Sequence, residues 1–400
     1  MIPHYYQHFC PVKILSGHNA VSNIPFELDI LGCKRAMIVT DKGVVGAGLI
    51  NIVREAFSDS DREIGYIFDE TPPDSSNRLV NKLAKLFEKQ KCDCFVAVGG
   101  GSALDTAKGA NIVISEGTDD ILKLQGNEII KADLFPMIAV PTTAGTGSEA
   151  TKVAVIYNEE KNTKMAFVSD RLYPRVAVLD SRMTMTVPPR LTAATGMDAL
   201  THAVEAYTCL QKKPIDDIFA RAAIELVRTY LVRATDNGSD EEDRLGMAHA
   251  SLFAGISFAN SMVGMVHALA HACGGVCHVP HGLANAILLP HGLEYNIASV
   301  PQYIAELSGM LGGSIEYMEV RDQAMVTVSL VKNLLSRLNR ISGIPMRLRD
   351  AGVSEDKLPA IARGAVNDGA LAFNLSLIHI SEPTRLLSIS YAVFCLKKKK

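Results

Sequence analysis

Apolar and polar residues alternate in short blocks along roughly the first half of this chain of 400 residues. Brief apolar runs rich in β-forming residues predict strands at 36–40, 65–68, 95–98 and 136–140. Between them, residues 77–89 repeat apolar side chains at helical spacing, and residues 102–115 predict a second helix. Strands separated by helices predict a parallel sheet with crossover helices.

The pattern changes at Pro188-Pro189-Arg190, and few β-type runs follow. Helices are predicted at 193–207, 215–233, 243–259, 263–272, 301–311 and 322–340. We therefore expect an α/β domain with a Rossmann-like parallel sheet over residues 1–187. An all-helical domain is expected over residues 188–374.

The last 26 residues, from Leu375, differ abruptly in character and end in four lysines. A basic tail is one interpretation, and an apolar segment at 386–396 with a polybasic end for membrane contact is another. We favour a third, in which residues 375–400 are a translated sequencing adapter followed by lysines encoded by poly-A. The native C-terminus is then missing, and the stretch is left out of the expected fold.

Composition excludes several classes of function. The net charge of −3 gives no basic patch, so nucleic acid is not expected as a partner. No apolar run reaches the ~20 residues of a membrane-spanning helix, and the N-terminus lacks a secretory pattern. The eight cysteines are scattered, which favours a reduced, cytoplasmic protein.

Candidate ligand-binding residues follow the predicted strands, at Asp41, Gly99–Ser102 and Thr142–Ser148. Ligands of parallel sheets bind at the carboxyl ends of strands. Three glycines permit close approach of a ligand, and Ser102 can cap the helix that follows. The N-terminus of that helix would present free N–H groups to a pyrophosphate. On glycine alone, a tight turn without a ligand is an equal alternative.

The standard dinucleotide fingerprint is absent from the first strand–helix turn. Residues 145–150 match the G-x-G-x-x-A variant, but a strand pattern follows, so we interpret that match as accidental. Asp41 ends the first predicted strand, where a carboxylate can accept hydrogen bonds from ribose hydroxyls and repel a 2′-phosphate. It therefore favours NAD over NADP, although a plain turn residue is the alternative.

Five of the eleven histidines lie within residues 266–293, among Gly, Ala, Leu and Val. His267 and His271 are four residues apart, and so are Asp198 and His202, which places each pair on one helix face. A carboxylate with imidazoles suits a divalent ion such as Fe²⁺ or Zn²⁺, whereas a lone core histidine is the usual alternative. Spacing leaves several further candidates open, namely His278, His281, Cys273 and Cys277. His291 is expected to cap or pack.

Four motifs resemble the iron-containing (group III, lactaldehyde-reductase-like) alcohol dehydrogenases: GGGSALDTAKG, PTTAGTGSEATKVAVI, GMDALTHAVEAY and VHALAHACGGVCHVPHGLANAILLPHGLEYN. The resemblance runs from about residue 7 to Asn374. It implies a nucleotide-binding first domain, a metal-binding second domain, four metal ligands and a histidine near the substrate. The implied ligands are Asp198, His202, His267 and His281, and the substrate-side histidine is His271. The cofactor candidates are Asp41, Asp74, Gly99, Gly100, Gly101, Ser102, Asp105, Thr142, Thr143, Thr146, Thr151 and Lys164. Asp74 stands where the family often has Asn.

The implied activity is hydride transfer between NAD and a small primary alcohol or diol, or its aldehyde, with Fe²⁺ or Zn²⁺ and as a homodimer. Glycerol-dehydrogenase-like and dehydroquinate-synthase-like enzymes are the nearest alternatives. The polyanionic substrate of the synthase would need basic residues near the metal, and residues 261–300 contain no Lys or Arg. A metal-dependent hydrolase without a nucleotide would leave the GGGS turn and Asp41 unexplained.

Overall fold

The computed structural model describes residues 3–161, 163–314 and 317–375. These residues form two compact units. An α/β unit holds residues 9–187 and 239–248, and a helical unit holds residues 3–8, 188–238 and the described residues from 249 onward. Residues 376–400, most of the stretch interpreted as an adapter, lie outside the described residues.

The α/β unit contains a sheet of six parallel strands in the order β1-β9-β6-β4-β2-β3, and a smaller sheet in the order β5-β8-β7. The strands are β1 (Lys13–Ser16), β2 (Arg35–Val39), β3 (Glu63–Phe68), β4 (Cys94–Gly99), β5 (Gly126–Asn127), β6 (Met137–Pro141), β7 (Val153–Asn158), β8 (Thr163–Val168) and β9 (Val176–Leu179). The helices are α1 (Ile24–Ile30), α2 (Lys42–Gly46), α3 (Leu49–Ala56), α4 (Asn77–Lys89) and α5 (Gly101–Ser115). The predicted parallel sheet is thus confirmed.

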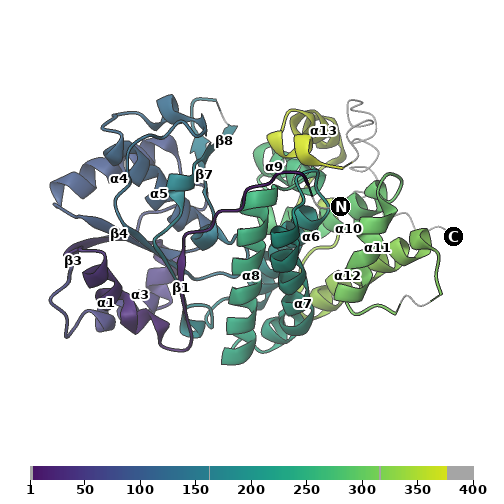
Figure 1. Ribbon diagram of the computed structural model, residues 1–400, viewed down its shortest axis with the longest axis horizontal. Coiled ribbons are helices and arrows are strands. Elements are labelled where there is room, and N and C mark those ends of the chain that lie inside the picture. The colour runs from purple at the N-terminus through teal and green to yellow at the C-terminus, as the bar shows by residue number, and fades with distance from the viewer. Residues whose placement is uncertain (1–2, 162, 315–316, 376–400) are drawn as a thin grey trace. The chain divides into compact units, whose positions relative to one another are not determined.

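Helices lie over both faces of the large sheet (Figure 1). The residues of its central strands are buried. Met37 of β2 and Phe95 of β4 pack with α4 and α5 on one face, whereas Ile38 and Val96 pack with α1 and α3 on the other. Because both faces are covered, these strands appear in the sequence as continuous apolar runs. Neighbouring strands β2, β4 and β6 run in the same direction, so their carboxyl ends share one edge.

The helical unit is built around α6, in which nearly every residue from Thr192 to Tyr207 is buried. Contacts with α7, α9 and α10 cover this helix (Figure 1). The helices are α6 (Pro189–Tyr207), α7 (Pro214–Asp236), α8 (Glu241–Ser261), α9 (Met265–Cys277), α10 (His281–Asn296), α11 (Pro301–Met310), α12 (Val320–Ser342) and α13 (Leu358–Val366). Helix α8 begins in residues assigned to the α/β unit. The predicted all-helical second half is confirmed, and α10 and α13 are additions to the helices predicted in it.

Candidate functional site

Helix α6 holds Asp198 and His202 on consecutive turns of its buried length. Helix α9 carries His267 and His271 in the same relation, and His281 is the first residue of α10. Gly282 lets α10 approach α6, because a Cβ atom there would lie 2.7 Å from the Ala194 carbonyl oxygen. The close approach of these two helices brings His281 to Asp198.

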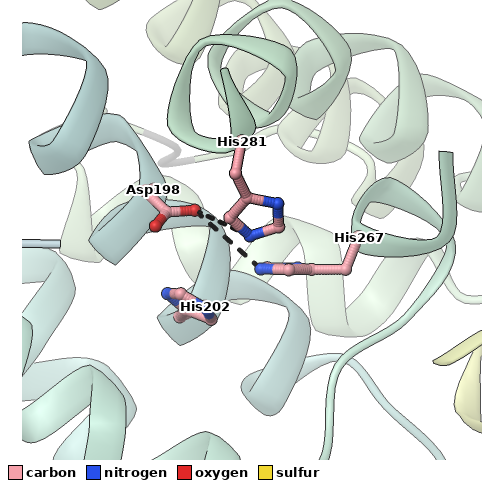
Figure 2. Close-up of side chains that lie close together, drawn as sticks. All are labelled: Asp198, His202, His267 and His281. Carbon is pink, nitrogen blue, oxygen red and sulfur yellow. Dashed lines mark ion pairs between the residues drawn. The ribbon is translucent and has the colours of Figure 1, made fainter. Parts of the chain in front are cut away.

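One ligand atom from each of Asp198, His202, His267 and His281 lies within 4.8 Å of the others (Figure 2). Asp198 Oδ1 is 3.6 Å from His281 Nε2 and 4.0 Å from His267 Nε2. The first three of these residues are buried, and the His281 side chain is 31% exposed. The group is therefore almost enclosed, with one partly open side.

The donor set of this group fits a divalent ion. It consists of one carboxylate and three imidazoles without a thiolate, as Fe²⁺ or Zn²⁺ accepts. Burial lowers the pKa of His267 and of His281 well below the usual value, so both rings are neutral and keep a lone pair. Burial also raises the pKa of Asp198, but the three histidines and Asn285 outweigh it, and the net shift is downward. Asp198 is thus an anion, and the rings of His267 and His281 beside it are neutral.

The other candidates of the histidine-rich stretch do not join the group. Cys273 is buried, and burial raises the pKa of its thiol to about 12. His278 is exposed and ends α9 with a positive φ of 54°. His291 is buried within α10, as its packing role predicted, and burial lowers its pKa to about 4.

The glycine turn lies at the shared carboxyl edge of the sheet, in the α/β unit. Gly100 precedes α5, which begins at Gly101. A Cβ atom on Gly101 would lie 2.9 Å from Thr146 Cγ2, and one on Gly99 would lie 2.6 Å from Ala103 Cβ. The turn therefore requires glycine, and it exposes the N-terminus of a 15-residue helix. Ser102 is not the cap that we predicted, because it lies inside the helix and its hydroxyl donates to the Pro73 carbonyl oxygen.

Models of one enzyme family match both the stretch with the glycine turn and the stretch with the metal candidates. A family model described as iron-containing alcohol dehydrogenase matches residues 11–181, and one described as the C-terminal part of the Fe-containing alcohol dehydrogenase family matches residues 192–390. The 1,3-propanediol dehydrogenase of Klebsiella pneumoniae is 39% identical over 355 residues, covering 88% of this chain and 90% of its own length. The NAD-dependent methanol dehydrogenase of Bacillus methanolicus is 34% identical, covering 90% and 93%. A crystal structure of 1,3-propanediol oxidoreductase superimposes with a TM-score of 0.93 at 36% identity, covering 98% of this chain and 100% of its own.

The chain belongs to the iron-containing alcohol dehydrogenase family. It is therefore an oxidoreductase that transfers hydride between NAD and an alcohol or diol, or the corresponding aldehyde. Membership of this family favours that activity over the lyase and hydrolase alternatives. Among the described residues no single helix has the length and apolar character to cross a membrane, although α8 and α9, bent by 102°, pass that test as a pair.

Two of the predicted cofactor residues in this dehydrogenase bond to each other. Lys164 Nζ lies 2.8 Å from Asp74 Oδ1. Asp41 directly follows β2, and its Oδ1 accepts a hydrogen bond of 2.9 Å from Val44 N at the start of α2. Its other oxygen points toward Gly99, where a Cβ atom would lie 3.5 Å away. Asp41 therefore caps a helix and also borders the glycine turn.

Lys108 is a residue of the α/β unit that the sequence reasoning missed. Lys108 is 1% exposed, and its ammonium group donates to the carbonyl oxygens of Ser148, Thr151 and Val153 at 2.8 to 3.0 Å. Asp105 accepts hydrogen bonds from Ser148 Oγ and Val155 N, so both of its oxygens are engaged within the protein. These bonds attach the threonine-rich segment to α5.

The threonines of that segment lie around the glycine turn. Thr142 N donates to the Gly99 carbonyl oxygen at 3.0 Å, and a Cβ atom on Gly100 would lie 3.2 Å from Thr143 Oγ1. Thr151 is buried, and its hydroxyl accepts from Lys108. The segment therefore forms a wall of the turn. Its helical part is a single 3₁₀ turn before β7, as expected if the match of residues 145–150 to the dinucleotide fingerprint is accidental.

Three further residues surround the metal candidates. His271 Nδ1 lies 2.9 Å from Asp368 Oδ2, and its ring stacks on His281 at 5.2 Å between centroids. Asn285 Nδ2 lies 2.6 Å from Asp198 Oδ1. Glu205 Oε2 lies 2.6 Å from His267 Nδ1. Spacing could have suggested Glu205 and Asn285, which follow His202 and His281 by three and four residues, but neither was predicted.

A second group of possible ligands occurs in the α/β unit, where Cys33, Asp93 and Cys94 lie within 4.8 Å of one another. Both oxygens of Asp93 accept backbone N–H groups, from Lys34 and Arg35. The hydrogen bond to Cys33 and burial raise the pKa of Cys94, which keeps this thiol protonated. The group is therefore not assigned to a metal.

Proposed function

We propose that Asp198, His202, His267 and His281 hold the divalent ion of this alcohol dehydrogenase, Fe²⁺ in preference to Zn²⁺. The observation that carries the proposal is the convergence of these four side chains from three helices. When bound, the ion supplies a Lewis acid that lowers the pKa of an alcohol hydroxyl. His271, one turn from His267 and 35% exposed, is the proposed proton relay between that hydroxyl and solvent.

We further propose that NAD binds at the carboxyl edge of the sheet. Gly99, Gly100, Gly101 and Ser102 would receive the pyrophosphate at the N-terminus of α5. Asp41 would accept the adenosine ribose hydroxyls. The remaining proposed contacts are Asp74, Asp105, Thr142, Thr143, Thr146, Thr151 and Lys164. The close packing of the glycines against Ala103 and Thr146 supports this assignment.

The proposed substrate is a small, uncharged primary alcohol or diol. The 40 residues from 261 to 300, which carry His267, His271 and His281, contain no Lys or Arg to bind an anionic substrate. Similarity to a 1,3-propanediol dehydrogenase and a methanol dehydrogenase supports the same range. Two further proposals are that the chain works as a homodimer in the cytoplasm and that its domains divide at residues 187/188. The compact units support that division.

The test is to load the purified protein anaerobically with Fe²⁺ or Zn²⁺ and follow NAD reduction with a panel of short alcohols and diols. Asp198→Ala should lose both bound metal and activity. His278→Asn changes an exposed histidine of the same stretch and should retain both. Full metal content in Asp198→Ala would refute the proposed site.

A further inference from the structure

Glu205 is a buried carboxylate directly behind His267. Its Oε1 accepts a hydrogen bond of 2.7 Å from Val266 N, and its Oε2 accepts one of 3.2 Å from His267 N. The same Oε2 lies 2.6 Å from His267 Nδ1. Gly264 leaves room for this arrangement, since a Cβ atom there would lie 3.1 Å from Oε1. The carboxylate thus contacts both the backbone and the ring of one histidine.

These contacts determine the state of the His267 ring. Backbone N–H groups only donate, so both oxygens of the ionised Glu205 serve as acceptors. His267 Nδ1 then donates its proton to Oε2, and the lone pair of the neutral ring is on Nε2. Nε2 is the atom that faces Asp198 Oδ1, at 4.0 Å, and Asn285 Nδ2, at 3.2 Å. The carboxylate and the ligand group therefore lie on opposite sides of one imidazole.

We propose that Glu205 is a positioning residue of the metal site, which holds His267 in the Nδ1–H tautomer with Nε2 directed at the ion. This inference rests on the proposed metal site. A histidine ligand whose second nitrogen donates to a carboxylate is fixed in orientation and becomes a stronger base. Loss of such a partner typically reduces metal affinity by about 10–100-fold.

A competing explanation is that Glu205 only stabilises the first turn of α9 through the N–H groups of Val266 and His267. Glu205→Gln separates the two roles because it preserves shape. If the NH₂ of the new side-chain amide faces Val266 N, two hydrogen-bond donors face each other. If it faces His267 instead, His267 Nδ1 must accept a hydrogen bond. The ring proton then moves to Nε2, where it prevents this nitrogen from coordinating the ion.

The experiment measures the dissociation constant of Zn²⁺ by competition with a chelating indicator, together with the melting temperature of the metal-free protein. Glu205→Gln should raise the Zn²⁺ dissociation constant about 10–100-fold. Glu205→Asp, which keeps the charge, should raise it less, whereas a packing role predicts the reverse order. The matched control is Asp216→Asn, because Asp216 is buried and lies 2.6 Å from Nδ1 of His8, which is not a proposed ligand. Asp216→Asn should change the melting temperature. Its Zn²⁺ dissociation constant should stay within about 3-fold of that of the unaltered protein, well below the change expected for Glu205→Gln.

The outcomes distinguish this inference from the proposed function. Failure of the unaltered protein to bind Zn²⁺ would refute the metal site itself. Binding by the unaltered protein together with unchanged affinity in Glu205→Gln would refute only the positioning role. If Glu205→Gln does not fold, the unaltered Zn²⁺ form still gives an answer by NMR. A short bond to the carboxylate should shift the His267 Nδ1 proton strongly downfield, and an ordinary shift would contradict the inference.

Discussion

Replacement of Lys108 by methionine should destabilise the α/β unit by about 3 kcal/mol. The substitution removes a charged donor from three carbonyl oxygens, two of them buried and that of Val153 partly buried. A hydrogen bond to a charged group contributes about 2 kcal/mol, so loss of the three bonds costs about 6 kcal/mol. Burial lowers the pKa of Lys108 from 10.5 to about 8, so removal of the charge recovers about 3 kcal/mol. The cost of the lost hydrogen bonds is therefore larger than the free energy recovered by removing the buried charge.

Equilibrium unfolding in urea measures this difference. The matched control is Lys123→Met, because Lys123 pairs with Asp119 on the surface and both side chains are largely exposed. Because solvent screens such an exposed pair, Lys123→Met should leave the unfolding free energy almost unchanged. The KM for NAD should also rise in Lys108→Met, since the threonine-rich segment loses its attachment to α5. An unfolding free energy of Lys108→Met within about 1 kcal/mol of the unaltered protein would refute the reasoning, since loss of one hydrogen bond to a charged group already costs that much.

Three further predictions concern pH, proton transfer and cofactor choice. Burial raises the pKa of Glu149 from 4.5 to about 7, so the folded protein keeps a proton that the unfolded chain loses. Stability should then fall as pH rises from about 4.5 to about 7, by up to about 3 kcal/mol, and Glu149→Gln should flatten this fall in urea midpoints. His271→Ala should lower turnover and change the pH–rate profile at normal metal content. Asp368→Asn should have the same effects more weakly. An unchanged pH–rate profile in His271→Ala would exclude His271 as the proton relay. Asp41→Ser keeps the helix cap but removes the charge, so the kcat/KM preference for NAD over NADP should fall about 10-fold, and an unchanged ratio would contradict the ribose role.

Sequence patterns predicted the elements that carry strong local signals. Helix α4 begins and ends where its apolar stripe predicted, and Ser76 caps it. Strands β2, β4 and β6 appeared as apolar runs because helices cover both faces of the sheet. Short strands such as β1 and β9, with four residues each, gave too little periodicity to be recognised. Helix α10 was missed because Pro290 interrupts its apolar pattern.

Spacing along the chain brought Asp198 with His202, and His267 with His271, to attention only as pairs on single helices, and it left His281 among several open candidates. The convergence of the four metal candidates depends on the approach of α10 to α6 at Gly282, which no local pattern encodes. The contact of Glu205 with His267 joins residues 62 positions apart. Lys108 contacts Thr151, which is 43 positions away in the chain. Lysine side chains are rarely buried, so nothing in the sequence predicts a buried ammonium group here. Such long-range polar contacts are determined by tertiary packing.

The covalent path of the chain has a consequence for protein engineering. Residues 3–8 belong to the helical unit, although the α/β unit begins at Phe9, and residues 239–248 return to the α/β unit. His8 bonds to the buried Asp216 of α7 and stacks on Phe219. A chimaera made by a single crossover at residue 187 would therefore take this histidine from one parent and its aspartate from the other. Exchange of a whole unit between related enzymes requires junctions near residues 8, 187, 238 and 248 together.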